Sequence, residues 1–233
     1  MTKSKVFDSN KLISDLKSLA DPSYKDFMAG LLPNLDPKSI IGVRMPALRS
    51  YLKGLGSFDE VEVFLRDLPH RFYEENLLHM MIISRLKDYD LWKDELVIFF
   101  PYIDNWAVCD LPAKKDLLKN AHDLKVFIRE HLKTDLPYQI RYLINLLRVF
   151  YLDDFFDDEV LELVLKVDSP SYYVKMMKAF FVQSLFVKDR DLALKILRDK
   201  VLDEKTQKMA LRKILDSKRV DRLTKEYIRS LSL

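Results

Sequence analysis

The sequence predicts an all-α protein in which paired helices stack into an α-solenoid. Three observations predict it: apolar residues recur at helical spacing, glycine is confined to the first quarter of the chain, and prolines return at nearly regular intervals. The chain has 233 residues, of which 48% are hydrophobic and 32% are charged, an ordinary composition for a folded protein. We expect one domain over residues 1–233, long enough to bury a continuous core.

The apolar residues follow the 3.6-residue period of an amphipathic helix. Clear examples are Leu12, Ile13, Leu16 and Leu19; Val61, Phe64 and Leu65; Leu77, Met80, Met81 and Ile83; and Leu192, Leu194, Ile196 and Leu197. The last of the four glycines is Gly56. The rest of the chain therefore has no Asn-Gly or Asp-Gly hairpin turn and no glycine-rich phosphate loop, which argues against a β-rich body and a nucleotide-binding motif there.

Proline spacing predicts the repeat. The regularly spaced members are Pro33, Pro69, Pro101, Pro137 and Pro170, separated by 36, 32, 36 and 33 residues. In Asp135-Leu136-Pro137 and Asp168-Ser169-Pro170, a cap candidate precedes a proline suited to the first helical turn. A helix-pair period of about 35 residues is typical of HEAT and TPR solenoids, which present a concave face to a long partner. The alternative is an irregular helical domain whose prolines mark loops.

The composition also excludes several classes of protein. No apolar run approaches the roughly 20 residues that cross a bilayer, and residues 1–5 lack the apolar core of a signal peptide. The single cysteine, Cys109, cannot form an internal disulfide. The four histidines lack metal-site spacing. We therefore expect a cytoplasmic protein without cofactor or metal, acting as a monomer.

Two charge clusters have different interpretations. The acidic cluster predicts a helix start on a solvated edge, and comprises Asp153, Asp154, Asp157, Asp158, Glu159 and Glu162. The basic cluster carries a net charge of +6 over residues 205–225 once Asp216 and Asp221 are subtracted, and comprises Lys205, Lys208, Arg212, Lys213, Lys218, Arg219, Arg222 and Lys225. It is either a solvated helix face or a phosphate-binding surface.

The segment Ile103–Asp110 contains the most distinctive residues. Asp104-Asn105 predicts a helix start, after which Trp106 and Asp110 would lie one turn apart on one face. An indole beside a carboxylate suits a site that holds a sugar or base and stabilises positive charge. The alternative is a core tryptophan with Asp110 capping a second helix at Pro112.

Six sequence blocks, in chain order, resemble the AlkD-like family of HEAT-repeat DNA alkylation-repair glycosylases. They are Gly42-Val43-Arg44-Met45-Pro46-Ala47-Leu48-Arg49, Tyr73-Glu74-Glu75, Asn105-Trp106-Ala107-Val108-Cys109-Asp110, Gln139-Ile140-Arg141-Tyr142-Leu143-Ile144, Tyr172-Tyr173-Val174-Lys175-Met176, and the helix from Lys208 to Ser217. The third block matches the family's active-site block, and the resemblance spans nearly the whole chain.

The resemblance implies hydrolysis of the N-glycosidic bond of cationic N3- or N7-alkylpurines in double-stranded DNA. Asp110 matches the catalytic carboxylate, Trp106 one of two indoles around the deoxyribose, and Arg141 the arginine that contacts the lesion backbone. The resemblance also implies a basic groove, for which the expected DNA-binding residues are Arg44, Lys175, Lys178, Lys208, Arg212, Lys213 and Lys218.

One departure separates the functional alternatives. Phe180 stands where the family usually has its second tryptophan, and phenylalanine has a smaller, weaker aromatic face. The chain is then either a glycosylase or a catalytically weak or inactive DNA-binding relative, and Phe180 could also be an ordinary core aromatic beside Phe181. A third alternative is a protein-interaction solenoid, which the fold alone would permit.

Overall fold

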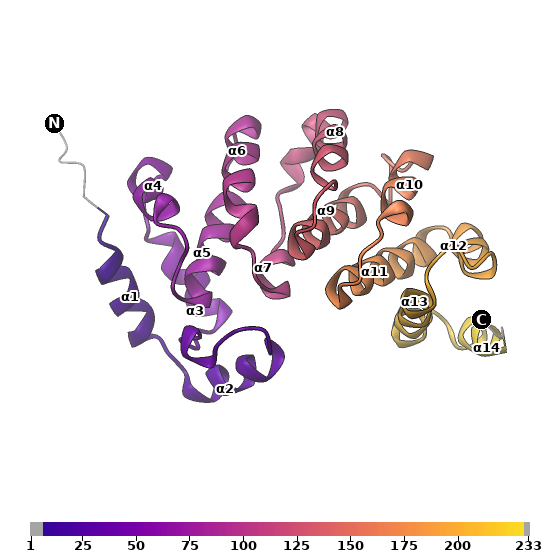
Figure 1. The fold of residues 1–233 in the computed structure, drawn as a ribbon, viewed down its shortest axis with the longest axis horizontal. Helices are drawn as coiled ribbons and strands as arrows, with labels where there is room; N and C mark the ends of the chain where they lie inside the picture. The colour runs from indigo at the N-terminus through magenta and orange to yellow at the C-terminus, as the bar shows by residue number, and fades with distance from the viewer. Residues whose placement is uncertain (1–6, 231–233) are drawn as a thin grey trace. The chain divides into compact units, whose positions relative to one another are not determined.

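The computed structural model describes residues 7–230, and the chain divides into two compact units, residues 1–114 and 115–233. The described residues form helices, turns and one isolated bridge between Ala20 and Val43, without a β-strand (Figure 1). The all-α prediction is confirmed. Within the described part, no helix is both long and apolar enough to cross a membrane.

The N-terminal unit contains seven α-helices and two short 3₁₀ helices in its described residues. They are α1 (Ser9–Ser18), α2 (Pro22–Leu31), η1 (Pro37–Ser39), α3 (Met45–Lys53), α4 (Phe58–Arg66), α5 (Tyr73–Ile83), α6 (Tyr89–Phe99), η2 (Phe100–Tyr102) and α7 (Trp106–Cys109). Helix α5 packs against α3, α6 and α7. All eleven residues of α5 are buried, as expected of a helix covered on every side.

The C-terminal unit contains the 3₁₀ helix η3 and the helices α8 to α14. Their bounds are η3 (Lys115–Asn120), α8 (Ala121–His131), α9 (Pro137–Phe150), α10 (Asp158–Lys166), α11 (Tyr172–Lys188), α12 (Arg190–Arg198), α13 (Glu204–Asp216) and α14 (Arg222–Ser230). Helix α11 packs between α9 and α13, while α8 packs on α9, α12 on α11 and α14 on α13. These neighbours make a layer of α9, α11 and α13 with partner helices beside it, the stacking of helix pairs that a solenoid requires.

The structure corrects some predicted helix starts. Pro137 does occupy the first turn of α9, but the N-cap residue is Leu136, and Asp135 is not the cap. Pro170 precedes α11, whose N-cap is Ser171, because the helix begins only at Tyr172. Local cap chemistry indicated each boundary to within a few residues.

The apolar periodicity identifies most of the core, with exceptions at helix ends. Val61, Phe64 and Leu65 are buried as predicted. Leu19 is 40% exposed because it lies just past α1 as its C-cap residue. The acidic cluster begins α10 as predicted: the Asp157 side chain accepts a hydrogen bond from the N–H of Val160 and caps the helix.

Candidate functional site

Trp106 and Asp110 are positioned by the four-residue helix α7 of the N-terminal unit. The predicted start is confirmed: Asn105 is buried and its Oδ1 accepts hydrogen bonds from the N–H groups of Ala107 (3.0 Å) and Val108 (3.1 Å). The N–H of Asp110 donates to the carbonyl of Trp106 at 3.0 Å. The indole and the carboxylate therefore belong to residues one helical turn apart.

The orientation of the Trp106 indole is fixed by α2. Its Nε1–H donates to the carbonyl of Leu31, the last residue of α2, at 3.2 Å. The Nδ2 of Asn34 donates to the carbonyl of Asp104, which attaches the segment before α7 to the same region. The ring is half-buried. Because its N–H is satisfied within the protein, a ligand would meet the aromatic surface rather than the donor.

Asp110 is exposed and ends α7 as its C-cap residue. The alternative in which Asp110 caps a second helix at Pro112 is wrong. Residues 111–114 are not helical, and the next helical element, η3, begins at Lys115. Asp110 therefore does not begin a helix at Pro112.

Glu74 is a buried carboxylate whose role the sequence did not reveal. One of its oxygens accepts from the N–H groups of Gly42 (2.7 Å) and Val43 (3.1 Å), and the other accepts from Ile41 (2.9 Å). Gly42 has φ +97, and a Cβ there would lie 2.7 Å from the carbonyl oxygen of Asp21. Only glycine fits this backbone, so the first family-like block is a loop fastened to α5, which in turn packs against α7.

Arg44 lies at the end of that loop and is exposed. Its Nε donates to Asp21 at 2.8 Å, and its guanidinium lies 5.0 Å from the centre of the Tyr24 ring. Hydrogen bonds from the Ser23 hydroxyl and from Arg44 hold the pKa of the Asp21 carboxyl well below its usual range. The predicted DNA-binding residue Arg44 thus already has a local carboxylate partner.

Arg141 of α9 is in the C-terminal unit and only 3% exposed. Its Nη1 donates to the carbonyl of Tyr173, in the first turn of α11, at 2.9 Å. Because it joins two packed helices, Arg141 is held in a fixed orientation within this unit.

The structure brings together Phe180 of α11 and Lys213 of α13. Phe180 is half-buried, and the Lys213 ammonium lies 5.0 Å from the ring centre. Phe181, next in the chain, is completely buried. The ordinary core aromatic of this pair is therefore Phe181, whereas Phe180 presents part of its ring beside a cation.

Two of the predicted DNA-binding lysines are occupied by contacts within the unit. Lys175 pairs with Asp203 at 2.8 Å. Lys178 is 6% exposed, and its ammonium donates to the carbonyls of Leu165 (3.2 Å) and Val167 (2.6 Å) at the end of α10. Desolvation lowers the pKa of Lys178. This placement makes Lys178 a helix-end cap, and it does not support a role in phosphate contact.

The remaining predicted cations lie on or just after α13. Lys208 and Arg212 are exposed and form i,i+4 pairs with Glu204 (2.5 Å) and Asp216 (3.3 Å). Lys218 is exposed, lines a recess of about 580 Å³, and makes no ion pair within the described part of the chain. Exposed i,i+4 pairs exchange readily with solvent or a ligand because each stabilises the helix by only ~0.3–0.5 kcal/mol.

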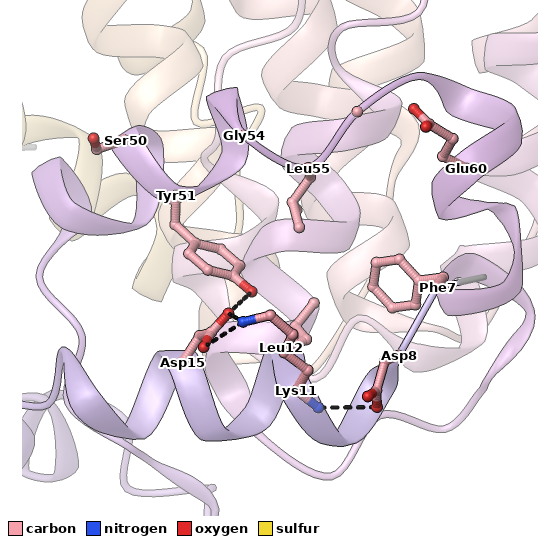
Figure 2. A pocket seen from close by; sticks show the side chains of 11 residues that line it. Phe7, Asp8, Lys11, Leu12, Asp15, Ser50, Tyr51, Gly54, Leu55 and Glu60 are labelled. Carbon is pink, nitrogen blue, oxygen red and sulfur yellow. Dashed lines mark hydrogen bonds and ion pairs between the residues drawn. The ribbon is translucent and has the colours of Figure 1, made fainter. Parts of the chain in front are cut away.

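A second recess, of about 530 Å³, lies in the N-terminal unit between α1 and α3 (Figure 2). The Lys11 ammonium and the Tyr51 hydroxyl both donate to the Asp15 carboxylate, the latter at 3.0 Å. Burial and Asp15 raise the pKa of Tyr51 to about 12. Asp8 and Glu60 at the rim cap α1 and α4. Sequence reasoning did not identify this recess, and the polar groups named here already serve one another or the helix ends.

The sequence was also compared with known proteins. No protein-family model matches the chain, and no curated protein matches it. The argument for function therefore rests on the residues of the two units and on the resemblance of the six blocks.

Proposed function

We propose that the protein binds double-stranded DNA and hydrolyses the N-glycosidic bond of cationic N3- or N7-alkylpurines. The observation that carries the proposal is α7, which holds a half-buried indole and an exposed carboxylate one turn apart in the segment that resembles the active-site block of the AlkD-like family. The rigid Trp106 ring would lie against the deoxyribose, and Asp110 would stand near its anomeric carbon.

The reaction needs little acid catalysis because the leaving group is already cationic. The bond between C1′ and the purine nitrogen breaks, and its electron pair neutralises the base. The sugar becomes an oxocarbenium-like cation, which the Asp110 carboxylate would stabilise electrostatically. Water then adds to C1′ and loses a proton to Asp110 or solvent, leaving an abasic site. Arg141 is 3% exposed and donates to the Tyr173 carbonyl, so the proposal does not rest on the contact with the lesion backbone that the resemblance implies for it.

Asp110→Asn tests the catalytic assignment. We expect it to abolish release of 7-methylguanine from alkylated duplex DNA, measured by mass spectrometry of the free base, while DNA affinity changes less than about twofold, since the substitution removes one negative charge without removing a phosphate contact. Asp94→Asn on the exposed face of α6 is the matched control and should excise at the wild-type rate. Unchanged excision by Asp110→Asn would remove this carboxylate from the mechanism.

A second candidate function, DNA binding without base release, is favoured by the pair of Phe180 and Lys213. An ammonium 5.0 Å from the ring already uses the aromatic face that would stabilise a cationic sugar. On this alternative, wild type releases no base, and Phe180→Trp with Lys213→Gln gains measurable release. Release by wild type equal to that of the double variant would contradict the alternative.

A further inference from the structure

The C-terminal unit contains a recess that joins the C-terminal ends of three helices of one layer. It has a volume of about 580 Å³, within the range of ligand-binding pockets. Its lining residues come from α9 and the bend after it, from α11 and from the turn after α13. They are Arg148, Val149, Leu152, Asp153, Gln183, Ser184, Lys188, Ser217, Lys218 and Arg219. We call this set of residues the C-terminal recess.

The C-terminal recess has a surplus of positive charge. Four of its lining residues are cations and one, Asp153, is an anion, which pairs with Lys188. Cations at helix ends commonly offset the helix dipole, which contributes about half a negative charge at each C-terminus. Three helix ends would therefore balance about 1.5 charges, whereas the side chains supply +3. Lys218 and Arg219 make no ion pair within the described residues.

Part of the polar lining of the recess is held by hydrogen bonds within the protein. Arg148 donates from Nε (3.0 Å) and Nη2 (2.8 Å) to Oδ1 of Asn145, and from Nη1 to the Ser184 hydroxyl at 3.5 Å. The Ser217 hydroxyl accepts from the backbone N–H of Arg219 at 3.3 Å and from Gln183 at 3.4 Å. These bonds hold the guanidinium and the turn that carries the unpaired cations, so a ligand would not have to order them.

We propose that the C-terminal recess binds a phosphate group, and that this phosphate belongs to the backbone of bound double-stranded DNA. The guanidinium fork of Arg219 suits two oxygens of a phosphodiester, and Lys218 supplies a point charge. Arg148, whose guanidinium is held by Asn145 and Ser184, adds positive charge at the wall. Hydroxyl and amide groups at the wall offer neutral donors. The assignment of the phosphate to DNA rests on the proposed function. The binding of a phosphate group in the recess does not depend on that function.

The test compares two double variants that remove the same charge. Lys218→Gln with Arg219→Gln removes the unpaired cations of the recess. Lys133→Gln with Lys195→Gln removes two exposed cations of the same unit that lie outside the recess. Binding to an undamaged 20-base-pair duplex is measured by fluorescence anisotropy from 50 to 200 mM salt. We expect the recess variant to bind roughly tenfold more weakly and its salt slope to fall by about one, while the control changes less than about twofold.

A second measurement tests phosphate binding by the recess in the absence of DNA. Inorganic pyrophosphate is titrated into wild type and the recess variant, and amide NMR shifts are followed for residues 183–188 and 217–219. Saturable shifts in wild type that the variant lacks support the recess, even if the duplex fails to bind and the proposed function falls. Equal DNA affinities of the two double variants would overturn DNA as the source of the phosphate. Absence of pyrophosphate shifts, together with those equal affinities, would overturn the recess itself.

Discussion

Single residues fix the loops around α7 through buried polar contacts. Glu74 is the clearest case, because its carboxylate accepts hydrogen bonds from three consecutive backbone N–H groups. Backbone donors can substitute for a salt bridge in this way because each hydrogen bond to a charged acceptor stabilises the folded state by ~1.5–3 kcal/mol. The carboxylate is therefore a structural determinant of the N-terminal unit.

Glu74→Gln tests this role. The amide keeps one acceptor oxygen and turns an NH₂ group toward the backbone donors, so we expect the free energy of unfolding to fall by roughly 3 kcal/mol. Urea denaturation followed by circular dichroism measures the loss. Glu62→Gln on the exposed face of α4 is the matched control and should stay within about 0.5 kcal/mol of wild type. Equal stability of the two variants would contradict the assignment.

His79, which is buried, and His70, which is half-buried, form a pair that makes stability depend on pH. Nε2 of His70 lies 2.8 Å from Nδ1 of His79, and the His79 ring stacks on Phe99 with the centres 3.8 Å apart. Burial lowers the pKa of His70 to about 4 and that of His79 to about 2. In the unfolded chain both imidazoles have a pKa of about 6.5.

Because both folded-state pKa values are depressed, the unfolded chain binds more protons below pH 6.5. The stability of the neutral pair is complete above that pH and is lost as pH falls toward 4, by up to ~1.4 kcal/mol per pH unit for each histidine. Urea midpoints between pH 7 and 5 measure the slope. His70→Gln with His79→Phe should flatten it, whereas His122→Gln at an exposed position should not. A slope that survives in the double variant would show another group to be responsible.

At the scale of elements, α7 depends on its cap more than the longer helices do. Four residues cannot form a stable helix alone, so Asn105 and the packing on α5 must hold it. The same cap chemistry at Asp88 begins α6, whose eleven residues include four buried ones. A short helix with a strong cap places its side chains accurately while presenting little hydrophobic surface of its own.

Asn105→Ala should therefore loosen α7 selectively. We expect the amides of Ala107 and Val108 to lose roughly tenfold in hydrogen-exchange protection, equivalent to ~1–2 kcal/mol of local stability. Asp88→Ala, the matched control, should change the protection of α6 less, because packing holds that helix. Comparable losses in both helices would show that the cap is not what holds α7.

At the scale of the whole molecule, positive charge is distributed unequally between the units. Residues 115–233 hold 24 lysines and arginines against 19 aspartates and glutamates, a formal charge of +5, whereas residues 1–114 hold 15 against 17, a charge of −2. The total of +3 conceals this difference. If the protein binds DNA as proposed, contacts with the phosphates should come mainly from the C-terminal unit.

Salt dependence tests this distribution. If about four phosphates are neutralised, duplex affinity should fall roughly 100-fold between 50 and 200 mM salt. Lys53→Gln with Lys87→Gln, two exposed cations of the N-terminal unit, should leave the slope unchanged. Affinity independent of salt would favour the protein-interaction alternative over a DNA-binding protein.

The sequence by itself determined the all-α class, the stacking of helix pairs and the start of α7, because apolar period, proline position and cap residues act over a few neighbouring positions. Asn105 is an example, since its side chain accepts hydrogen bonds from the N–H groups of Ala107 and Val108, two and three residues later. Only the tertiary structure decided which side chains already have partners within the protein. Glu74 binds a loop some 30 residues earlier in the chain, Lys178 is buried at the end of α10, and Phe180 meets a cation from α13. Such contacts join residues far apart in the chain, and no local pattern specifies them.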